Sequence, residues 1–263
     1  MSDTWLITGA TSGFGRLVAD RALDRGAHVI AVGRRTDQLE KLAVGGRVTP
    51  VTLDITTPGA QDTLRAAIDA AGGLDVLINN AGYGLFGAVE QIDDAEARAI
   101  FDTNVLANLA VLRAALPALR ASAGRIVQVS SLIGQFAFAS SGLYSASKAA
   151  VELLSEALAA EVAPAGVRVT IVEPGTFATE FATSVRVVAP DEVYAPTVGR
   201  FLTDFAQLPA SAFGDPADVA EAIMAVVNAP EPPLRLAVGA DAVAGIRASL
   251  QSRLAELDQW AAA

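Results

Sequence analysis

The chain has 263 residues, of which 52% are hydrophobic and 18% are charged, and its formal net charge is −10. These values allow a large buried core and exclude a disordered chain, and the acidic balance argues against nucleic acid or an anionic membrane as the main partner. With no cysteine and one histidine, the chain has no disulfide framework and too few ligands for a conventional zinc site, so we expect no metal.

The N-terminal segment predicts a nucleotide-binding turn. Met1–Thr4 leads directly into a short apolar strand at Trp5–Ile7, which leaves no room for a signal peptide. Since Gly, Asn, Arg or Pro interrupts every long apolar run, we also expect no membrane span, and therefore a cytoplasmic protein. Thr8–Gly15 reads T-G-A-T-S-G-F-G and stands between this strand and a helix that ends at Gly26. Glycines also serve plain tight turns, but between a first strand and a first helix they favour binding of a pyrophosphate.

The second strand, Val29–Val32, completes a βαβ unit and suggests which cofactor binds. An acidic residue after this strand would bind the ribose 2′-hydroxyl of NAD, but here the sequence has Gly33, Arg34 and Arg35. Glycine leaves room for a 2′-phosphate and a guanidinium can form a charged fork with it, so we expect NADP(H) rather than NAD(H). Arg34 is the stronger candidate and Arg16 could assist; the simpler alternative is a pair of surface arginines.

The next strands predict the middle of a sheet. We expect a strand at Val48–Asp54, a helix around Gln61–Ala71 and a strand at Leu74–Ile78. The last of these runs into Asn79-Asn80-Ala81-Gly82, whose amides could secure the sheet or border a nucleotide crevice. We expect both roles, with Asn79 the more structural.

A long helix from about Ala95 to Leu119 carries Asn104 in its interior, where asparagine is a poor helix former. The side chain would face solvent, or it would face inward, need a partner and kink the helix.

A fifth strand, Arg125–Ser131, precedes a helix that starts near Tyr144. Tyr144 and Lys148 share one face of that helix, with their Cβ atoms roughly 5–6 Å apart. A lysine ammonium there would lower the tyrosine pKa from about 10, so that the phenol exchanges protons near neutral pH. Ser131 could hold the oxygen of a carbonyl or alcohol beside it. A tyrosine four residues before a lysine is also common by chance.

The same helix, which runs to about Val162, has two apolar stripes that suggest burial against both the sheet and a second subunit. The expected core face consists of Val151, Leu154 and Leu158. The second apolar stripe consists of Ala150, Leu153 and Ala157, and Glu152 and Glu156 are expected elsewhere on the surface.

The C-terminal third begins with a strand at Val167–Val172. The segment at about 177–213 is rich in aromatic residues and proline, which predicts a substrate-binding lid, or alternatively helices that pack their aromatics into the core. Its aromatic residues are Phe177, Phe181, Tyr194, Phe201, Phe205 and Phe213. Asp215-Pro216 begins a helix to about 228, and a strand near Leu234–Val238 and a helix from about 243 to 260 follow.

The alternation of strands and helices predicts an α/β fold: a Rossmann-like, doubly wound sheet of about seven mostly parallel strands with helices on both faces. We expect one domain over residues 1–263. The chain resembles the short-chain dehydrogenase/reductase family over nearly its whole length. Five motifs carry the resemblance, in matching order and spacing: T-G-A-T-S-G-F-G at 8–15, N-N-A-G at 79–82, Ser131, Y-S-A-S-K at 144–148 and P-G-x-x-x-T at 174–179.

The resemblance implies an enzyme that interconverts an alcohol and a carbonyl compound with NAD(P)(H). Tyr144 would be the general acid or base, Lys148 would bind the nicotinamide ribose and depress the tyrosine pKa, and Ser131 would orient the substrate oxygen. Asn104 would hold a water that links Lys148 to solvent. Ser130 competes with Ser131, but the offset of thirteen residues to Tyr144 favours Ser131.

Within the family, Gly9, Gly13 and Gly15 would cradle the pyrophosphate, Asp54 would lie near the adenine, and Thr179 near the carboxamide. With the arginines above, the predicted cofactor-binding residues are Gly9, Thr11, Ser12, Gly13, Phe14, Gly15, Arg34, Arg35, Asp54, Ile55, Asn80, Ala81, Gly82, Tyr144, Lys148, Pro174, Gly175, Thr176, Phe177 and Thr179.

Glu173 before Pro174-Gly175, with the aromatic segment, looks like relatives that act on apolar alcohols and ketones such as retinoids or steroids. We therefore expect a hydrophobic small-molecule substrate. Dimers and tetramers are both common in the family, which together with the second apolar stripe of the Tyr144 helix implies a homodimer or homotetramer. The alternative is a regulatory protein that binds NADP without turnover.

Overall fold

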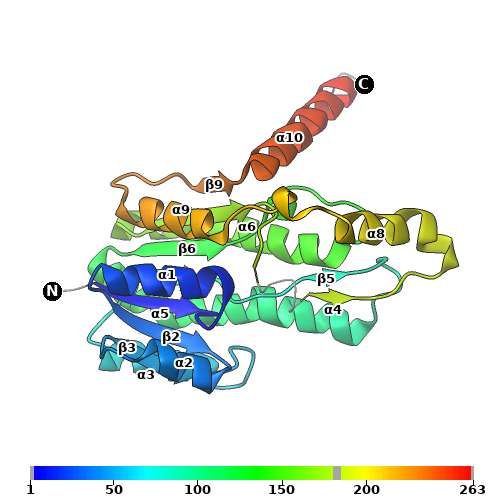
Figure 1. Cartoon of the computed structure of the whole chain (residues 1–263). Coiled ribbons are helices and arrows are strands. Elements are labelled where there is room, and N and C mark those ends of the chain that lie inside the picture. Colours follow the sequence, from blue (N-terminus) through cyan, green and yellow to red (C-terminus); the bar gives the residue numbers. More distant parts are fainter. Residues whose placement is uncertain (1–2, 180–184, 262–263) are drawn as a thin grey trace.

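The computed structural model describes residues 3–179 and 185–261 of the chain. Its centre is a seven-stranded parallel sheet in the order β3-β2-β1-β4-β6-β7-β9 (Figure 1). The strands are β1 (Thr4–Thr8), β2 (His28–Gly33), β3 (Val48–Thr52), β4 (Val76–Asn79), β6 (Arg125–Val129), β7 (Arg168–Pro174) and β9 (Arg235–Val238). The predicted doubly wound parallel sheet is confirmed.

Helices cover both faces of the sheet (Figure 1). They are α1 (Gly13–Asp24), α2 (Thr36–Leu42), α3 (Ala60–Ala70), α4 (Asp94–Phe101), α5 (Asn108–Ser122), α6 (Gly142–Val162), α8 (Arg200–Ala206), α9 (Pro216–Asn228) and α10 (Ala240–Trp260). Seven-residue α2 was not predicted, because it buries only Leu39 and Leu42 and so has little apolar periodicity. The predicted N-cap of α9 is confirmed: the Asp215 carboxylate accepts a hydrogen bond from Ala217 N.

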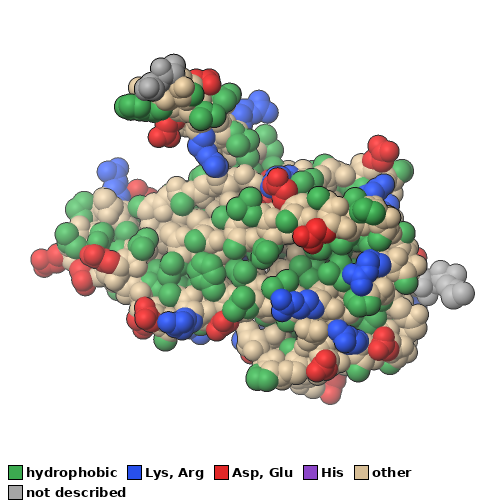
Figure 2. Space-filling model, turned by 180° about the vertical axis from the view of Figure 1, so that it is seen from behind, with side chains coloured by type: hydrophobic (Ala, Val, Ile, Leu, Met, Phe, Trp, Pro, Cys, Tyr) green, Lys and Arg blue, Asp and Glu red, His purple; other side chains and the backbone are tan. Residues whose placement is uncertain are grey.

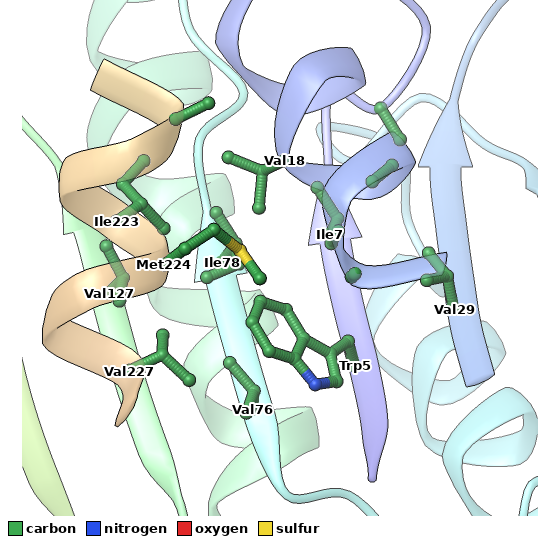
Figure 3. Close-up of a cluster of buried hydrophobic side chains, with 14 of the residues drawn as sticks. Trp5, Ile7, Val18, Val29, Val76, Ile78, Val127, Ile223, Met224 and Val227 are labelled. Atoms are coloured by element: carbon green, nitrogen blue, oxygen red, sulfur yellow. The ribbon is translucent and has the colours of Figure 1, made fainter. Parts of the chain in front are cut away.

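Two apolar layers hold these helices on the sheet, because successive side chains of a strand point to opposite faces. Trp5 and Ile7 of β1 pack with α1 and α9, where Met224 and Val227 lie beside the indole ring together with Val76 of β4 (Figure 3). Leu6 lies on the opposite face, in the layer formed with α3, α5 and α6. The central strands are therefore buried on both sides, and their carboxyl ends open toward the candidate site.

The long helix predicted near 95–119 runs from Asp94 to Ser122 and contains the π-helical turn η1 (Asp102–Ala107) between α4 and α5. By length and composition alone this helix could cross a membrane. In the fold it packs against α3 and α6, and half of its most apolar stretch is buried. The apolar character is thus accounted for by its place in the helical layer.

The core face of α6 differs from the prediction. Val151 and Leu158 are buried, but Leu154 is 41% exposed, Leu153 is 68% exposed, and Glu152 is 3% exposed rather than on the surface. The helix is rotated so that Glu152 faces inward, where its Oε2 accepts hydrogen bonds from Gln135 and Arg235, while its buried Oε1 has no hydrogen-bond partner among the described residues.

The segment predicted as a lid forms short elements in its described part, 177–179 and 185–213. Strand β8 (Arg186–Val187) pairs in parallel with β5 (Leu85–Phe86), which was not predicted because each strand has only two residues. The π-helical turn η5 (Ala195–Gly199) leads into α8, and Phe138, Phe201, Phe205 and Phe213 form a chain of ring contacts. Phe181 lies outside the described residues.

Candidate active site

The glycine turn and the N-N-A-G segment are held together by Thr8. Its Oγ1 accepts hydrogen bonds from the backbone N–H groups of Asn80 (2.9 Å) and Ala81 (3.0 Å), and Asn80 Nδ2 donates to Thr8 O at 2.9 Å. Asn79 accepts a hydrogen bond from Thr8 Oγ1 at 3.4 Å through its Oδ1 and donates from Nδ2 to Asn108 O at 3.2 Å, which agrees with its predicted structural role. The ends of β1 and β4 thus form one rigid edge.

The turn itself has the form of a phosphate cradle. Gly9 and Gly13 have φ angles of +69° and +52°, which disfavour residues with side chains. A Cβ at Gly15 would collide with Gly9 O, and a Cβ at Gly9 would lie 2.8 Å from Asn80 Nδ2. Ser12 precedes α1, so the backbone from Thr11 to Gly15 stands at the positive end of a 12-residue helix. These residues fit a nicotinamide dinucleotide, and Phe14 borders the same turn.

The two arginines after β2 take different positions. Arg35 donates from Nη2 to Thr11 O (2.9 Å), which places its guanidinium against the glycine turn. The Arg34 side chain is 78% exposed, with Nη1 4.0 Å from Asp54 Oδ2. Hydrogen bonds from Thr56, and secondarily the Arg34 charge, lower the pKa of Asp54. Ile55, the next residue, is buried beneath this rim.

Arg16, which was expected to assist, is paired with Asp20 at 3.0 Å on α1. The structure therefore brings Gly33, Arg34, Arg35 and Asp54 to one rim beside the glycine turn, whereas Arg16 has an ion-pair partner on its own helix.

The π-helical turn directs Asn104 inward, where it is 2% exposed. Its Oδ1 accepts from Tyr83 N (3.1 Å), and its Nδ2 lies 3.0 Å from both Tyr83 O and Ser147 Oγ. The inward alternative is therefore the observed one, and the π turn is the helix distortion that accompanies it. A Cβ at Gly82 would lie 2.9 Å from Asn104 Oδ1 and 3.6 Å from Lys148 Nζ, so the glycine leaves the space between these two atoms open.

Ser131, Tyr144 and Lys148 come together at the carboxyl end of β6. Tyr144 and Lys148 are 7% and 6% exposed, and Lys148 Nζ lies 5.9 Å from the centroid of the Tyr144 ring. The ammonium donates to Val129 O at 2.9 Å, which fixes it under the end of the strand. Of the two serines that were candidates, Ser131 is hydrogen-bonded to the Tyr144 side chain, whereas Ser130 is on the side of Glu152.

The proton affinities of this pair differ from the expectation. Burial raises the pKa of Tyr144 above its ordinary value, and the hydrogen bond with Ser131 only partly opposes this. Burial also lowers the pKa of Lys148 to about 8, against the charge of Glu152. The prediction that Lys148 lowers the tyrosine pKa is therefore wrong for the protein by itself, because desolvation of the phenolate is the larger effect.

The predicted P-G-x-x-x-T segment meets the glycine turn from the β7 side. Gly175 N donates to Val238 O (2.9 Å), and Thr176 N donates to Asp241 Oδ2 (2.7 Å). Phe177 packs edge-on against Phe14, with 5.8 Å between the ring centroids. A Cβ at Gly13 would lie 3.9 Å from Thr179 Cβ. Pro174–Thr179 and Gly9–Gly15 therefore border the same space, and Asp241 of α10 positions the loop, a role that no sequence motif signals.

A buried acidic pair beside the site was also missed. Gln135 Nε2 donates to Glu152 Oε2 (3.2 Å) and to Glu173 Oε1 (2.6 Å), and Arg235 Nε lies 3.1 Å and 3.8 Å from the same two oxygens. Burial is the main cause that raises the pKa of Glu152, to about 7, and burial likewise raises that of Glu173. The one sequence signal was Glu173 at the end of a buried strand.

The chain matches the family described as short chain dehydrogenase over residues 3–188. It is 38% identical to oxidoreductase BOA17 of Botryotinia fuckeliana, over 92% of this chain and 91% of the relative. It is 35% identical to 3-ketodihydrosphingosine reductase of Bacteroides thetaiotaomicron, over 89% of this chain and 87% of that protein.

Solved structures of short-chain dehydrogenases are also similar to this chain. A short-chain dehydrogenase from Streptomyces avermitilis has a TM-score of 0.91 and 41% identity, covering 98% of this chain and 96% of its own. A Burkholderia cenocepacia short-chain dehydrogenase in complex with NADP has a TM-score of 0.77 and 29% identity, over 98% and 97% of the two chains. The 3-ketoacyl-(acyl-carrier-protein) reductase of Brucella melitensis, complexed with NADH, has a TM-score of 0.75 and 28% identity, over 90% and 96%.

Proposed function

The chain belongs to the short-chain dehydrogenase family and is an oxidoreductase, and from that premise we propose that it transfers a hydride between NADP(H) and a hydrophobic alcohol or carbonyl compound. The observation that carries the proposal is the meeting of the Ser131 and Tyr144 hydroxyls with Lys148 beside the glycine turn. Relatives of known structure bind NADP or NADH, so the family uses nicotinamide cofactors, which supply or accept the hydride.

The residues then have distinct roles in the proton half of the reaction. Ser131 orients the substrate oxygen, and Tyr144 donates a proton to that oxygen during reduction or accepts it during oxidation. Because burial raises the pKa of Tyr144, the phenol holds its proton at neutral pH, the form that donates. Lys148, with a pKa of about 8, stays mostly protonated at pH 7 and can return a proton to the phenolate. Asn104, facing Lys148 across Gly82, would hold the water that links it to solvent.

The preference for NADP(H) is supported by the rim after β2. A Cβ at Gly33 would lie only 2.7 Å from Thr11 Cγ2, and with glycine there the end of β2 carries no acid that would repel a 2′-phosphate. Arg34 and Arg35 supply two guanidinium groups at that rim. In this proposal Arg34 binds the phosphate and Arg35 holds the glycine turn.

A hydrophobic substrate is supported by the surroundings of Tyr144. Its ring belongs to an apolar cluster with Leu85 and Ile133, against which Phe86, Phe136 and Phe138 pack. The Phe86 ring lies 5.7 Å from the Tyr144 ring, edge to face. Carbonyl compounds with aromatic or long aliphatic groups match such walls. The relative named for a 3-keto compound fits the same substrate class.

The decisive experiment replaces Tyr144 by phenylalanine. We expect NADPH binding, measured by fluorescence titration, to be unchanged, and NADPH oxidation with a panel of aromatic and long-chain ketones and aldehydes to fall by at least about 10²-fold, because only the proton donor is lost. Tyr83→Phe is the matched control, since the Tyr83 hydroxyl is buried without a hydrogen-bond partner among the described residues. Near-normal turnover by the Tyr144→Phe variant would remove Tyr144 from this role. Binding of NADPH by the wild type without oxidation by any ketone would instead favour the sensing protein.

We also propose a homodimer or homotetramer built on the outer face of α6. Leu153 on α6 and Leu106 on the neighbouring η1 turn are 68% and 57% exposed, and exposed leucines on adjacent helical segments favour a subunit contact.

A further inference from the structure

The turn that follows Ser131 ends on the buried acidic pair of Glu152 and Glu173. Ser131 precedes the 3₁₀ turn η2 (Leu132–Gly134), and Gln135 follows that turn directly. The Nε2 atom of Gln135 donates hydrogen bonds to Glu152 Oε2 at 3.2 Å and to Glu173 Oε1 at 2.6 Å. One short turn therefore connects the serine of the candidate active site to two carboxyl groups on α6 and β7.

Two further contacts hold this turn in place. A Cβ at Gly134 would lie 2.8 Å from Ser130 Oγ and 3.2 Å from Glu152 Oε1, so the glycine lets the turn rest directly on the carboxyl group. On the other side, α10 projects from the protein body (Figures 1 and 2), and its Arg253 donates to Gln135 O at 3.4 Å. A displacement of the acidic pair would therefore displace the turn as well.

The contacts of the acidic pair indicate that it holds a proton. Glu152 and Glu173 are 3% and 2% exposed and are hydrogen-bonded to each other, which requires that one of the two carboxyl groups is protonated. Arg235, the cation in contact with both, also binds the Glu156 carboxylate, so three acids share this positive charge. Glu152 Oε1 is buried without a hydrogen-bond partner among the described residues, which suits a neutral carboxyl group. These contacts favour one shared proton.

We propose that Glu152 and Glu173 share one proton and that Gln135 is a positioning residue, through which this protonated pair fixes the Ser131 turn for catalysis. The inference rests on the proposed function, because it concerns how Ser131 orients the substrate oxygen. When the shared proton is released, two buried negative charges repel each other and the hydrogen bond between them is lost. Gln135 can then follow only one of the carboxylates, and Ser131 loses its alignment with the Tyr144 hydroxyl.

The reduction of a ketone should therefore slow as pH rises through the titration of the pair. Among the described residues, the charged groups packed around the pair and its glutamine are Lys148, Glu156, Arg235 and Arg253. Burial raises the pKa of Glu152 to about 7 and lowers the pKa of Lys148 to about 8. As pH rises, the pair releases its proton before Lys148 does.

Initial rates of NADPH oxidation with one ketone test this pH dependence. Glu173→Gln replaces the shared proton by an amide hydrogen, so it should have the wild-type kcat/KM at pH 6 and keep that value at pH 7.5, where the wild type falls by about 4-fold. Glu156→Gln, on the exposed side of Arg235, is the matched control and should fall like the wild type. Parallel pH profiles of Glu173→Gln and the wild type would overturn the shared-proton role.

A second variant tests whether the pair acts through Ser131. Gln135→Met keeps the length of the side chain but has no donor, so it should lower kcat by about 10-fold and leave NADPH binding unchanged. In a Ser131→Ala background, measured in single turnovers, the same substitution should cost nothing further, because the residue that it positions is absent.

Additive losses in the double variant, or a wild-type kcat for Gln135→Met, would overturn the role of Gln135 in an enzyme that is otherwise active. A wild type that reduces no ketone at any pH would instead overturn the proposed function, and this inference with it.

Discussion

Two neighbouring arginines show how single residues acquire different environments. The exposed Arg34 can turn toward a 2′-phosphate while giving up only a 4.0 Å contact with Asp54. Arg35 would first have to exchange its hydrogen bonds to Thr11. The two adjacent arginines therefore differ in the interactions that each must break to bind a 2′-phosphate. From the sequence alone, Arg34 was preferred only because it is nearer the end of the strand.

We predict that Arg34→Ala weakens NADPH binding by about 10- to 150-fold, the loss of a charged hydrogen bond of roughly 1.5–3 kcal/mol. NADH binding should be nearly unaffected, because NADH has no 2′-phosphate. Isothermal titration with both cofactors measures this, and Arg35→Ala is the comparison, since loosening the glycine turn should weaken both. Tighter binding of NADH than NADPH by the wild type would contradict the preference.

A variant with the opposite cofactor preference would carry an acidic residue at position 33. Gly33→Asp alone would meet Thr11 Cγ2 at 2.7 Å, so the test of a switch toward NADH combines it with Thr11→Ser, which removes that methyl group.

At the scale of elements, the segment after β7 is attached to the rest of the protein at a few points. Arg186 Nη1 lies 2.6 Å from Glu96 Oε1, and the Tyr194 hydroxyl donates to Glu90 at 2.6 Å. Between these anchors and α9, α8 lies over Phe138 through Phe201, with 4.5 Å between the ring centroids. Few other buried contacts hold α8, which is the character of an element that opens.

We predict that ligands protect this segment from trypsin. Arg200 at the start of α8 has a side chain that is 78% exposed, and cleavage after it should slow several-fold when NADP⁺ and a hydrophobic ketone are bound together, a pair that cannot react. Cleavage after the exposed Arg65 on α3 should keep its rate. Mass spectrometry of the fragments measures cleavage at each site. If cleavage after Arg200 were equally fast with and without the ligands, the prediction that this segment is a lid would be wrong.

At the scale of the whole molecule, the buried acidic pair makes stability depend on pH. The folded-state pKa of Glu152 is raised from 4.5 to about 7, so folding favours its protonated form. Below pH 4.5 this contribution is fully present, and it is lost as pH rises through about 7, because the unfolded chain releases the proton earlier. The groups that face the pair are Ser130, Gln135 and Arg235, with Glu156 and Lys148 nearby.

We predict that Glu152→Gln reduces the loss of unfolding free energy between pH 5 and 7.5, by on the order of 2–3 kcal/mol, since the amide cannot ionise. Urea unfolding at several pH values measures this, and the window stays below the pKa of Lys148 at about 8. Glu156→Gln, on the exposed side of Arg235, is the matched control and should follow the wild type. Parallel pH profiles of Glu152→Gln and wild type would show that Glu152 ionises freely in the fold.

The sequence by itself determined the parallel sheet, its long helices and the gathering of Ser131, Tyr144 and Lys148 at one strand end. Those features depend on periodicity and on residues close together in the chain, such as the strand–glycine turn–helix order and the four-residue offset of tyrosine and lysine. Only the tertiary structure decided that Glu152 is buried, because Gln135 and Arg235 come from 17 and 83 residues away. It likewise decided that the pKa of Tyr144 rises, since desolvation depends on the whole set of surrounding side chains rather than on the neighbouring lysine alone.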